Sequence, residues 1–453
     1  MTDTWQQAPV DEASRRALHD RGLDYRTVAG DEVDGWLQSV ARGFQDGERT
    51  DAHIAAGRDR NAGKRLTGVY DPAAPAAASA GPVATIASWI GDLTLPGETA
   101  VPACAISAVT VSPTHRRRGV ARALLEGELR TAAAQGLPAA MLTVSESTLY
   151  GRYGFGVATE SAESESTLYG RYGFGVATES ADLKIDTKRA NWIGPRPEGR
   201  VDFVTRAHAK DLMARLHERT RREAPGEIAL PPGHEDRFTG TAPDAHEGGD
   251  VRCVQYTDPS GAVRGVLAYR IRSHQDDFTK GTAALSRLVA NGADAYAALW
   301  RFVLELDLVG EVHADLAATD EPVLWMIDDR RAATVTVRDH QYVRILDIPA
   351  VLGSRRYDAP GAVLLDVEDP LDLAGGRFLL EVDADGRGAV ARAEGAAPAG
   401  VPHVRLGIAE LSAACLGGVS LLTLARAGRV QGADAAAARL LSWHVAPRLS
   451  IWY

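Results

Sequence analysis

The strongest constraint on the fold is the change from an extended to a helical pattern after residue 111. Residues 105–111 (AISAVTV) are apolar and rich in β-branched side chains, which is typical of a short buried strand. From Val120 onward, apolar residues recur at helical spacing until Gly136 ends the pattern. Three consecutive arginines, residues 116–118, stand between the two patterns. The sequence therefore predicts a strand, a basic turn and a helix in that order.

The basic turn has the properties of a phosphate site. Gly119 and the small Ala121 allow close approach to the first N–H groups of the helix, where the helix dipole favours an anion. Arg116–Arg118 add charge-assisted contacts. Pro113 helps to end the strand pairing, which leaves the backbone of Val109–Val111 available to an extended ligand arm. This combination indicates a pyrophosphate-bearing ligand such as an acyl-CoA; the alternative is a solvated helix start.

Composition indicates a multidomain enzyme in the cytoplasm. The 453 residues correspond to about three domains, and 45% hydrophobic residues suffice for packed cores. The N-terminus has no signal-peptide pattern, and no run approaches the length of about 20 apolar residues that a membrane helix needs. Three distant cysteines offer neither a disulfide framework nor zinc spacing, so no metal is expected. A net charge of -10 disfavours nucleic acid and suits a cationic substrate.

An 18-residue segment occurs twice. Ser145–Ala162 (SESTLYGRYGFGVATESA) recurs without a change as Ser164–Ala181, at an offset of 19 residues. Two identical copies do not form a solenoid, which needs about three or more repeats to bury a core. A recent tandem duplication or a sequence error explains the pattern, and one copy is then an insertion. Such an insertion is tolerated because the entropy cost of closing a loop grows only with the logarithm of its length.

The remaining chain predicts two further modules. Alternating helices and strands continue to about residue 319, with a strand at 263–271 and a helix at 293–308, but without a second basic turn. Strands then precede helices, as in an α+β domain. The expected strands are 342–349, 362–367 and 378–382, and the expected helices are 408–415, 419–425 and 434–441.

Two motifs carry a family resemblance. The spacing Arg116-x-x-Gly119-x-Ala121 resembles the signature of the GNAT superfamily of N-acetyltransferases, and residues 142–156 (LTVSESTLYGRYGFG) resemble an element of the Eis (enhanced intracellular survival) acetyltransferases. The resemblance covers nearly the whole chain. It implies an α/β and α+β architecture of tandem GNAT-type domains followed by a sterol-carrier-protein-like domain, typically assembled as a hexamer.

The resemblance also implies domain limits and cofactor contacts. Residues 1–183 would form the catalytic domain that binds acetyl-CoA, with the duplication at 145–181; residues 184–335 a degenerate acetyltransferase-like domain; and residues 336–453 the sterol-carrier-like domain. The acetyl-pantetheine arm would contact Val109, Thr110 and Val111. The pyrophosphate would contact Arg117, Arg118, Gly119, Val120, Ala121 and Arg122, and the cofactor would also contact Ser145 and Glu146 at the neighbouring strand.

The implied catalytic groups are a tyrosine and the terminal carboxylate. In this family the tyrosine of the Tyr-Gly-Arg element is the general acid, and a phenol suits that role because its pKa near 10 keeps it protonated at neutral pH. Tyr150 is the favoured candidate because its copy directly follows the predicted strand 139–144, whereas the copy of Tyr169 continues better into the chain that follows. The carboxylate of Tyr453 would be the general base.

The expected reaction is direct N-acetyl transfer to primary amines, either aminoglycoside-like polyamines or lysine side chains. The alternative is a catalytically impaired protein that binds lipid or CoA.

Overall fold

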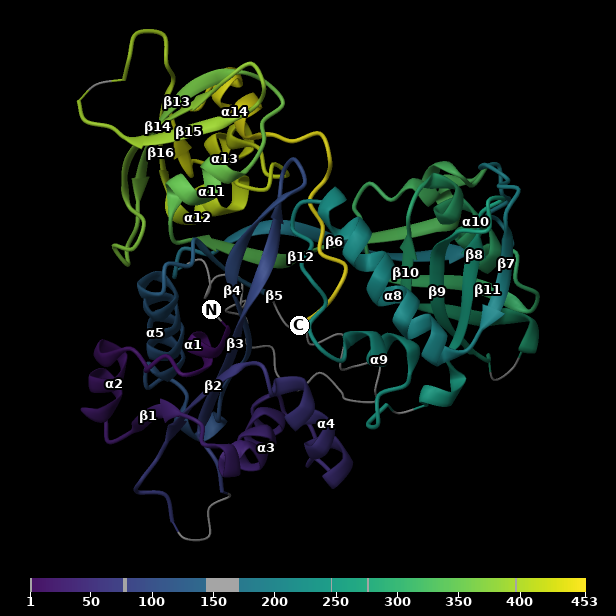
Figure 1. The fold of residues 1–453 in the computed structure, drawn as a ribbon, viewed down its shortest axis with the longest axis horizontal. Coiled ribbons are helices and arrows are strands. Elements are labelled where there is room, and N and C mark those ends of the chain that lie inside the picture. Colours follow the sequence, from purple (N-terminus) through teal and green to yellow (C-terminus); the bar gives the residue numbers. More distant parts are fainter. Residues whose placement is uncertain (1, 76–79, 144–170, 246, 275–276, 396) are drawn as a thin grey trace. The chain divides into compact units, whose positions relative to one another are not determined.

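The computed structural model describes two compact units. The described residues are 2–75, 80–143, 171–245, 247–274, 277–395 and 397–453. The first unit comprises residues 1–178, 340–447 and 452–453, and the second comprises residues 179–339 and 448–451. The chain passes from the first unit into the second along β6 (Gly175–Asp186) and returns along β12 (Ala333–Ile345) (Figure 1).

The sheet of the first unit has the strand order β1-β2-β3-β4-β5-β12. Its strands are β1 (Asp24–Thr27), β2 (Arg65–Tyr70), β3 (Ala84–Leu95), β4 (Thr99–Val111) and β5 (Ala139–Thr143). The pairs are antiparallel except β4 with β5, which run parallel and are joined through helix α5 (Val120–Ala134). The predicted strand, basic turn, helix and parallel strand are thus confirmed. The other helices are α1 (Thr2–Gln6), α2 (Glu12–His19), α3 (Val33–Gly43) and α4 (Asp51–Asn61).

A buried ion pair fixes α5 on this sheet. Leu124 and Leu129 of α5 are fully buried in one apolar core with strand residues of β4 and β5. Within that core the guanidinium of Arg65 lies 2.6 Å from the carboxylate of Glu128, which also accepts a hydrogen bond from the Ser88 hydroxyl. Arg65 further donates to the carbonyls of residues 8 and 9, so one side chain ties the N-terminal segment to β2 and α5. Because both charges are shielded from water, each requires its partner to remain buried.

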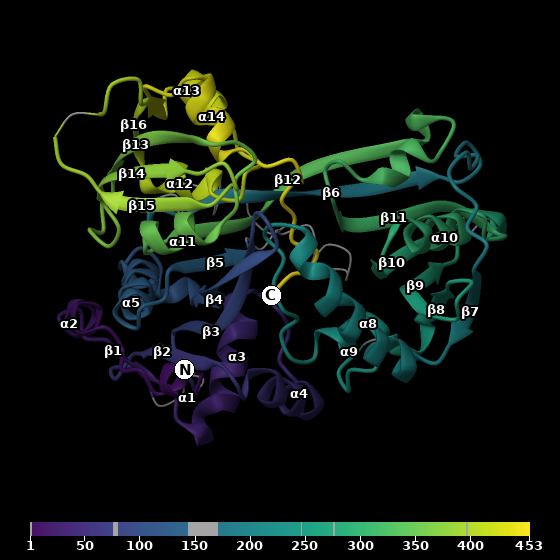
Figure 2. The same cartoon turned by 45° about the horizontal axis from the view of Figure 1, so that its top comes forward.

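The first unit also contains a five-stranded sheet of order β15-β14-β13-β16-β17 (Figure 2). Its strands are β13 (Gly361–Glu368), β14 (Gly376–Val382), β15 (Gly388–Arg392), β16 (His403–Gly407) and β17 (Val430–Gln431). The helices are α11 (Ile348–Ser354), α12 (Ile408–Ala414), α13 (Leu421–Arg426) and α14 (Ala435–Leu441). The predicted strands 362–367 and 378–382 do precede the three predicted helices, but α11 comes before these strands and β17 lies between α13 and α14.

The predicted strand 342–349 is too long at its C-terminal end. The strand β12 ends at Ile345 and pairs with β5, and α11 begins at Ile348. The Asp347 carboxylate caps this helix by accepting the N–H of Ala350 at 3.0 Å, and Pro349 has the fixed φ that suits a first helical turn. These local signals overrule the apolar pattern that suggested a continuous strand.

The second copy of the repeated segment is described from Arg171 onward, and several of its residues pack in the core. Tyr172 and Phe174 are 6% and 1% exposed, and the copy continues directly into β6. The buried guanidinium of Arg344 donates to the Tyr172 carbonyl at 2.8 Å. Gly175 packs so closely that a Cβ there would lie 2.0 Å from the carbonyl oxygen of Ala409. The first copy, residues 145–162, lies outside the described residues.

The second unit is a sheet of order β6-β11-β10-β9-β8-β7 with helices on both faces. Its strands are β7 (Arg200–Val204), β8 (Arg252–Thr257), β9 (Val263–Arg272), β10 (Gly281–Ala290) and β11 (Val309–Ala317), and its helices are α8 (Arg206–Thr220), α9 (His234–Thr239) and α10 (Ala293–Leu304). Figures 1 and 2 show α8 and α10 on opposite sides of this sheet. The parallel strands β10 and β11 are joined through α10, as β4 and β5 are through α5. Only Asn291 and Gly292 separate β10 from α10, so the arginine-rich turn has no counterpart at this position.

Candidate active site

The described pairing of β4 with β5 ends before the part of β4 where the ligand arm was predicted. Their parallel pairing covers Ala103 to Ile106 of β4, while β4 continues to Val111 with β3 as its partner. The N–H of Ser112 donates to the Val83 carbonyl at 2.8 Å, on the β3 side. Backbone N–H and C=O groups alternate in direction from one residue of a strand to the next. Those of Val109 and Val111 therefore point away from β3, to the side of β4 on which β5 pairs. Among the described residues, this edge carries no strand partner beyond Ile106.

β4 contains a bulge at Ala108, beyond its described pairing with β5. Ala108 has a φ of +51°, and the register with β3 shifts between Thr85 and Ala87. The Thr85 hydroxyl donates to the Ala108 carbonyl at 2.8 Å and lies 2.7 Å from the Thr110 hydroxyl. A Cβ at Gly43 of α3 would lie 2.4 Å from that of Thr110, so the Thr110 side chain packs against α3. Of the three residues predicted to contact the arm, Val109 and Val111 therefore offer the backbone groups.

The turn after β4 forms an uncapped helix start. A short 3₁₀ turn (Pro113–His115) is followed by Arg117 at φ +61° and Gly119 at φ +70°. No side chain caps α5, and the Ala123 N–H makes its first internal bond, to the Gly119 carbonyl at 3.0 Å. The amides of Val120, Ala121 and Arg122 consequently have no acceptor within the helix. Together with the exposed side chains of residues 116–118, these amides suit a pyrophosphate.

A fourth guanidinium joins this turn from a distant part of the chain. Arg21, which follows α2, donates from Nη1 to the Arg118 carbonyl. A Cβ at Gly119 would lie 2.2 Å from that Nη1 atom. Arg21 therefore lies on the turn although it is almost 100 residues away in sequence, and no motif around it signals this position.

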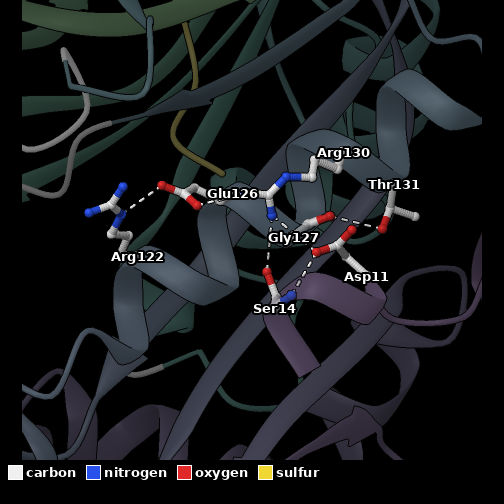
Figure 3. A network of polar contacts seen from close by, with 7 residues as sticks. All are labelled: Asp11, Ser14, Arg122, Glu126, Gly127, Arg130 and Thr131. Carbon is white, nitrogen blue, oxygen red and sulfur yellow. Dashed lines mark hydrogen bonds and ion pairs between the residues drawn. The ribbon is translucent and has the colours of Figure 1, made fainter. Parts of the chain in front are cut away.

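Arg122 differs from the other arginines because it has an acidic partner on its own helix. Its Nε lies 2.7 Å from Glu126, which also pairs with Arg130 at 2.7 Å (Figure 3). Arg130 in turn contacts Asp11 at 3.0 Å. The hydrogen bond to Glu126 raises the pKa of Arg122 above its usual range. The charge of Arg122 is thus partly balanced by Glu126.

His115 is held by contacts with two side chains. Its Nε2 lies 3.1 Å from the Asp71 carboxylate, and its Nδ1 lies 2.8 Å from the Thr114 hydroxyl. The hydrogen bond with His115 and the N–H of Ala73 hold the pKa of Asp71 below its usual range. With both ring nitrogens engaged, His115 supports the shape of the turn and is a poor candidate for a catalytic base.

Tyr453 contacts the last described residue of β5. The Thr143 hydroxyl, on the last residue of β5, donates to a terminal oxygen of Tyr453 at 3.1 Å. The Tyr453 ring meets the Trp89 ring edge to face, with centroids 5.2 Å apart. Burial raises the pKa of the Tyr453 phenol far above its usual value, so the phenol stays protonated at neutral pH. The adjoining Trp452 ring stacks edge-on against His340 at 4.3 Å.

The register of the sheet shows on which face this residue lies. Trp89 pairs with Ala105, which pairs with Met141, so their side chains share one face with Thr143. Ser88 points to the opposite face, where it bonds to Glu128 of α5. Tyr453 therefore lies on the face away from α5, beside the last paired residues of β4 and β5.

Four predicted residues cannot be placed. Ser145, Glu146, Tyr150 and the duplicate Tyr169 lie outside the described residues. The sequence analysis missed Arg21, Trp89 and Thr143, since each acts through a contact with a residue distant in sequence.

The cysteines are core residues. Cys104, Cys253 and Cys415 are all buried and unpaired, and burial raises the pKa of each thiol, to about 11 for Cys253 and about 12 for Cys415. Such thiols are not nucleophilic thiolates at neutral pH. The part of the chain that the structure describes contains no group of three or more His, Cys, Asp or Glu residues that could hold a metal ion. None of its helices combines the length and apolarity that crossing a membrane requires.

Replacing Gly119 with alanine should weaken acetyl-CoA binding. Gly119 has a left-handed backbone conformation, which costs a residue with a Cβ about 1 kcal/mol, and the Cβ would also crowd Arg21. We expect the dissociation constant for acetyl-CoA, measured by calorimetry, to rise about fivefold or more. Gly136→Ala is the matched control, because Gly136 has φ +75° at the other end of α5 and no atom within 4 Å. Equal affinities for the two variants would contradict a role of the turn in cofactor binding.

Comparison with known proteins assigns the chain to a family. Two models described as acetyltransferase (GNAT) domain match residues 24–158 and 234–345, and a sterol carrier protein domain model matches residues 348–450. An uncharacterised N-acetyltransferase of Streptomyces avermitilis is 32% identical over 90% of this chain and 92% of that protein. The N-acetyltransferase Eis of Mycobacterium bovis is 30% identical over 77% of this chain and 79% of that protein.

Solved structures agree with this assignment. Eis1 from Mycobacterium abscessus superposes with a TM-score of 0.72 at 26% identity, covering 95% of this chain and all of that one. A GCN5-related N-acetyltransferase from Anabaena variabilis, at 15% identity and a TM-score of 0.75 over 95% of this chain and all of that one, has the same fold. The chain therefore belongs to the Eis-type N-acetyltransferases of the GNAT superfamily, with two GNAT domains followed by a sterol-carrier-protein-like domain.

Proposed function

We propose that this enzyme transfers the acetyl group of acetyl-CoA directly to primary amines, either aminoglycoside-like polyamines or lysine side chains. One observation carries the proposal: the Thr143 hydroxyl, on the last described residue of β5, donates to a carboxylate oxygen of Tyr453. An anion held there, beside the last paired residues of β4 and β5, can receive a cationic amine next to a bound thioester.

The first unit supplies the groups that would hold the cofactor. Backbone groups of Val109 and Val111 point to the open edge, where they can bond the pantetheine arm. The amides of residues 120–122 and the guanidinium groups of residues 116–118 can bond the pyrophosphate. Bound acetyl-CoA supplies an activated acetyl group, and its fixed position lowers the entropic part of the barrier.

The carboxylate of Tyr453 would act as the general base. A terminal carboxyl group has a pKa of about 3.3–3.7, so it is an anion at neutral pH. It can orient an ammonium group and take the proton that the amine must lose before attack. The Thr143 hydroxyl keeps one oxygen in place, and the net charge of -10 favours the approach of a cation.

A tyrosine of the repeated segment would protonate the departing thiolate. Tyr150 is the residue that the sequence favoured, and Tyr169 is the alternative. The packing of Arg171 to Ala181 supports Tyr169, because the residues that immediately follow it in sequence are fixed in the first unit by Arg344 and Phe174. We therefore propose Tyr169 as the general acid.

Single substitutions of the two tyrosines separate these alternatives. Tyr169→Phe should lower kcat by about 10²-fold or more, because general acid catalysis contributes that much. Tyr150→Phe carries the same chemical change in an identical local sequence and should leave kcat near the wild-type value. Steady-state kinetics at saturating acetyl-CoA measure both. A loss confined to Tyr150→Phe would assign the acid to the first copy.

The proposed activity is tested by thiol release. Purified protein with acetyl-CoA and a panel of polyamines, aminoglycosides and lysine peptides should release free CoA in proportion to acetylated amine. No release with any amine would overturn the proposal, and retained CoA together with bound lipid in mass spectrometry would indicate a binding protein. We also propose a homohexamer, which light scattering on the same preparation checks.

A further inference from the structure

Side-chain amines are scarce in this chain. Fifty residues are Lys or Arg, but only Lys64, Lys184, Lys188, Lys210 and Lys280 are lysines. Four of these belong to the sequence of the second unit, so Lys64 is the single lysine in the sequence of the first unit, which holds the proposed site.

Lys64 and Tyr453, which carries the proposed base, contact the same aromatic ring. Lys64 directly precedes β2, and its Nζ lies 4.6 Å from the centroid of the Trp89 ring on the neighbouring strand. The same ring packs edge to face against Tyr453, at 5.2 Å between centroids. One aromatic ring thus contacts both the only lysine of the first unit and the residue whose carboxylate is bound by Thr143.

The cation that contacts the Trp89 ring is a lysine and not an arginine. In the part of the chain that the structure describes, six other cation–π contacts occur, and each uses an arginine. An arginine would serve a purely structural contact with Trp89 equally well, since a guanidinium also stacks on aromatic faces. A lysine differs because its amine can lose a proton and act as a nucleophile, and because its four-carbon stem is flexible.

We propose that Lys64 is a self-acetylation site of this enzyme, an inference that rests on the proposed acetyltransferase function. The ammonium group passes one proton to the Tyr453 carboxylate, and the amine nitrogen then attacks the thioester carbonyl carbon of acetyl-CoA. An N–C bond forms while the C–S bond breaks, the departing thiolate takes a proton from the tyrosine acid, and the resulting tyrosinate regains a proton from the attacking nitrogen. The products are N-acetylated Lys64, free CoA thiol and one released proton.

Peptide mapping tests this proposal in the full-length protein. After incubation with acetyl-CoA alone, mass spectrometry should show Lys64 acetylated at least about tenfold faster than any of the other four lysines. These four report the rate of uncatalysed chemical acetylation. The preference should vanish in protein unfolded with urea, and extending the chain beyond Tyr453 should slow acetylation of Lys64 but not of the other four.

A parallel assay with an external polyamine separates the two proposals. Turnover of the polyamine with no preference for Lys64 would overturn the self-acetylation site and leave the proposed function standing. Absence of both reactions would overturn the proposed function itself. Lys64→Arg keeps a cation on Trp89. In this variant the peptide map should no longer show an acetylated side chain in the first unit. A preference for Lys64 that persists at full rate in the extended chain would show chemical acetylation and contradict the proposal.

Discussion

Adding a short glycine-serine segment after Tyr453 should lower kcat by about 10²–10⁴-fold, the range that a positioned general base contributes. The extension converts the Tyr453 carboxylate into an amide, which cannot take a proton from an ammonium group. The aromatic ring and its contact with Trp89 stay in the chain, so the loss reports on the carboxylate. Steady-state thiol release measures kcat, and calorimetry should show acetyl-CoA affinity within about twofold of the wild type.

Tyr453→Phe is the matched control for the extension. It removes only the phenol oxygen, whose pKa burial raises so far that it stays protonated, and it preserves the carboxylate and the ring. We expect kcat within about threefold of the wild-type value, because no general acid or base is lost. An extended chain that retains the wild-type kcat would rule out the carboxylate as the base.

Arg344→Met should lower the free energy of unfolding by about 3–5 kcal/mol, the usual cost of removing one partner from a buried ion pair. Both side chains of the Arg344–Asp369 pair are 0% exposed, with two contacts of 2.7 Å between guanidinium and carboxylate. The substitution leaves Asp369 charged and buried, and it removes the bond from Arg344 to the Tyr172 carbonyl. The shift of the urea unfolding midpoint measures the effect.

An exposed ion pair between β13 and β14 provides a control, because replacing its arginine removes a guanidinium group without leaving a buried charge unpaired. Arg377 contacts Asp366 at 3.0 Å, but both side chains are about one-third exposed. Arg377→Met should therefore change the free energy of unfolding by about 1 kcal/mol or less. If both arginine variants unfold at the same urea concentration, the buried pair does not have the structural role inferred for it.

The same pair predicts how stability depends on pH. Burial alone would raise the pKa of Asp369, but Arg344 and the amides of Ala374 and Leu371 outweigh burial and hold it below its usual value. A carboxyl group whose pKa is lowered by folding stabilises the protein above its unfolded pKa, about 3.9. This contribution is lost as the pH falls through the lower pKa of the folded state. Arg344→Met should lack this acid-dependent component in urea titrations between pH 5 and pH 3.

Local sequence determined the elements of the first unit. The alternation of apolar residues, the arginine run and Gly119 predicted β4, the basic turn, α5 and β5, because strand and helix periods and capping residues act over a few neighbours. The same reasoning failed at residues 346–349, where the Asp347 cap starts a helix within an apolar run. The family motifs added the order of the domains.

Contacts between distant residues decided the candidate site. Arg21 reaches the Arg118 carbonyl, and Thr143 reaches the end of the chain, only after the sheet has assembled. Identical copies of a segment cannot be told apart by local pattern, whereas tertiary packing fixes Arg171 to Ala181 of the second copy. The sequence by itself determined that a strand, a basic turn and a helix follow one another, since neighbouring residues dictate these. Only the tertiary structure placed Tyr453, Trp89 and Lys64 together. The pairing register of β2 and β3 and the path of the C-terminal segment bring them to one face of the sheet, and no local sequence pattern encodes either.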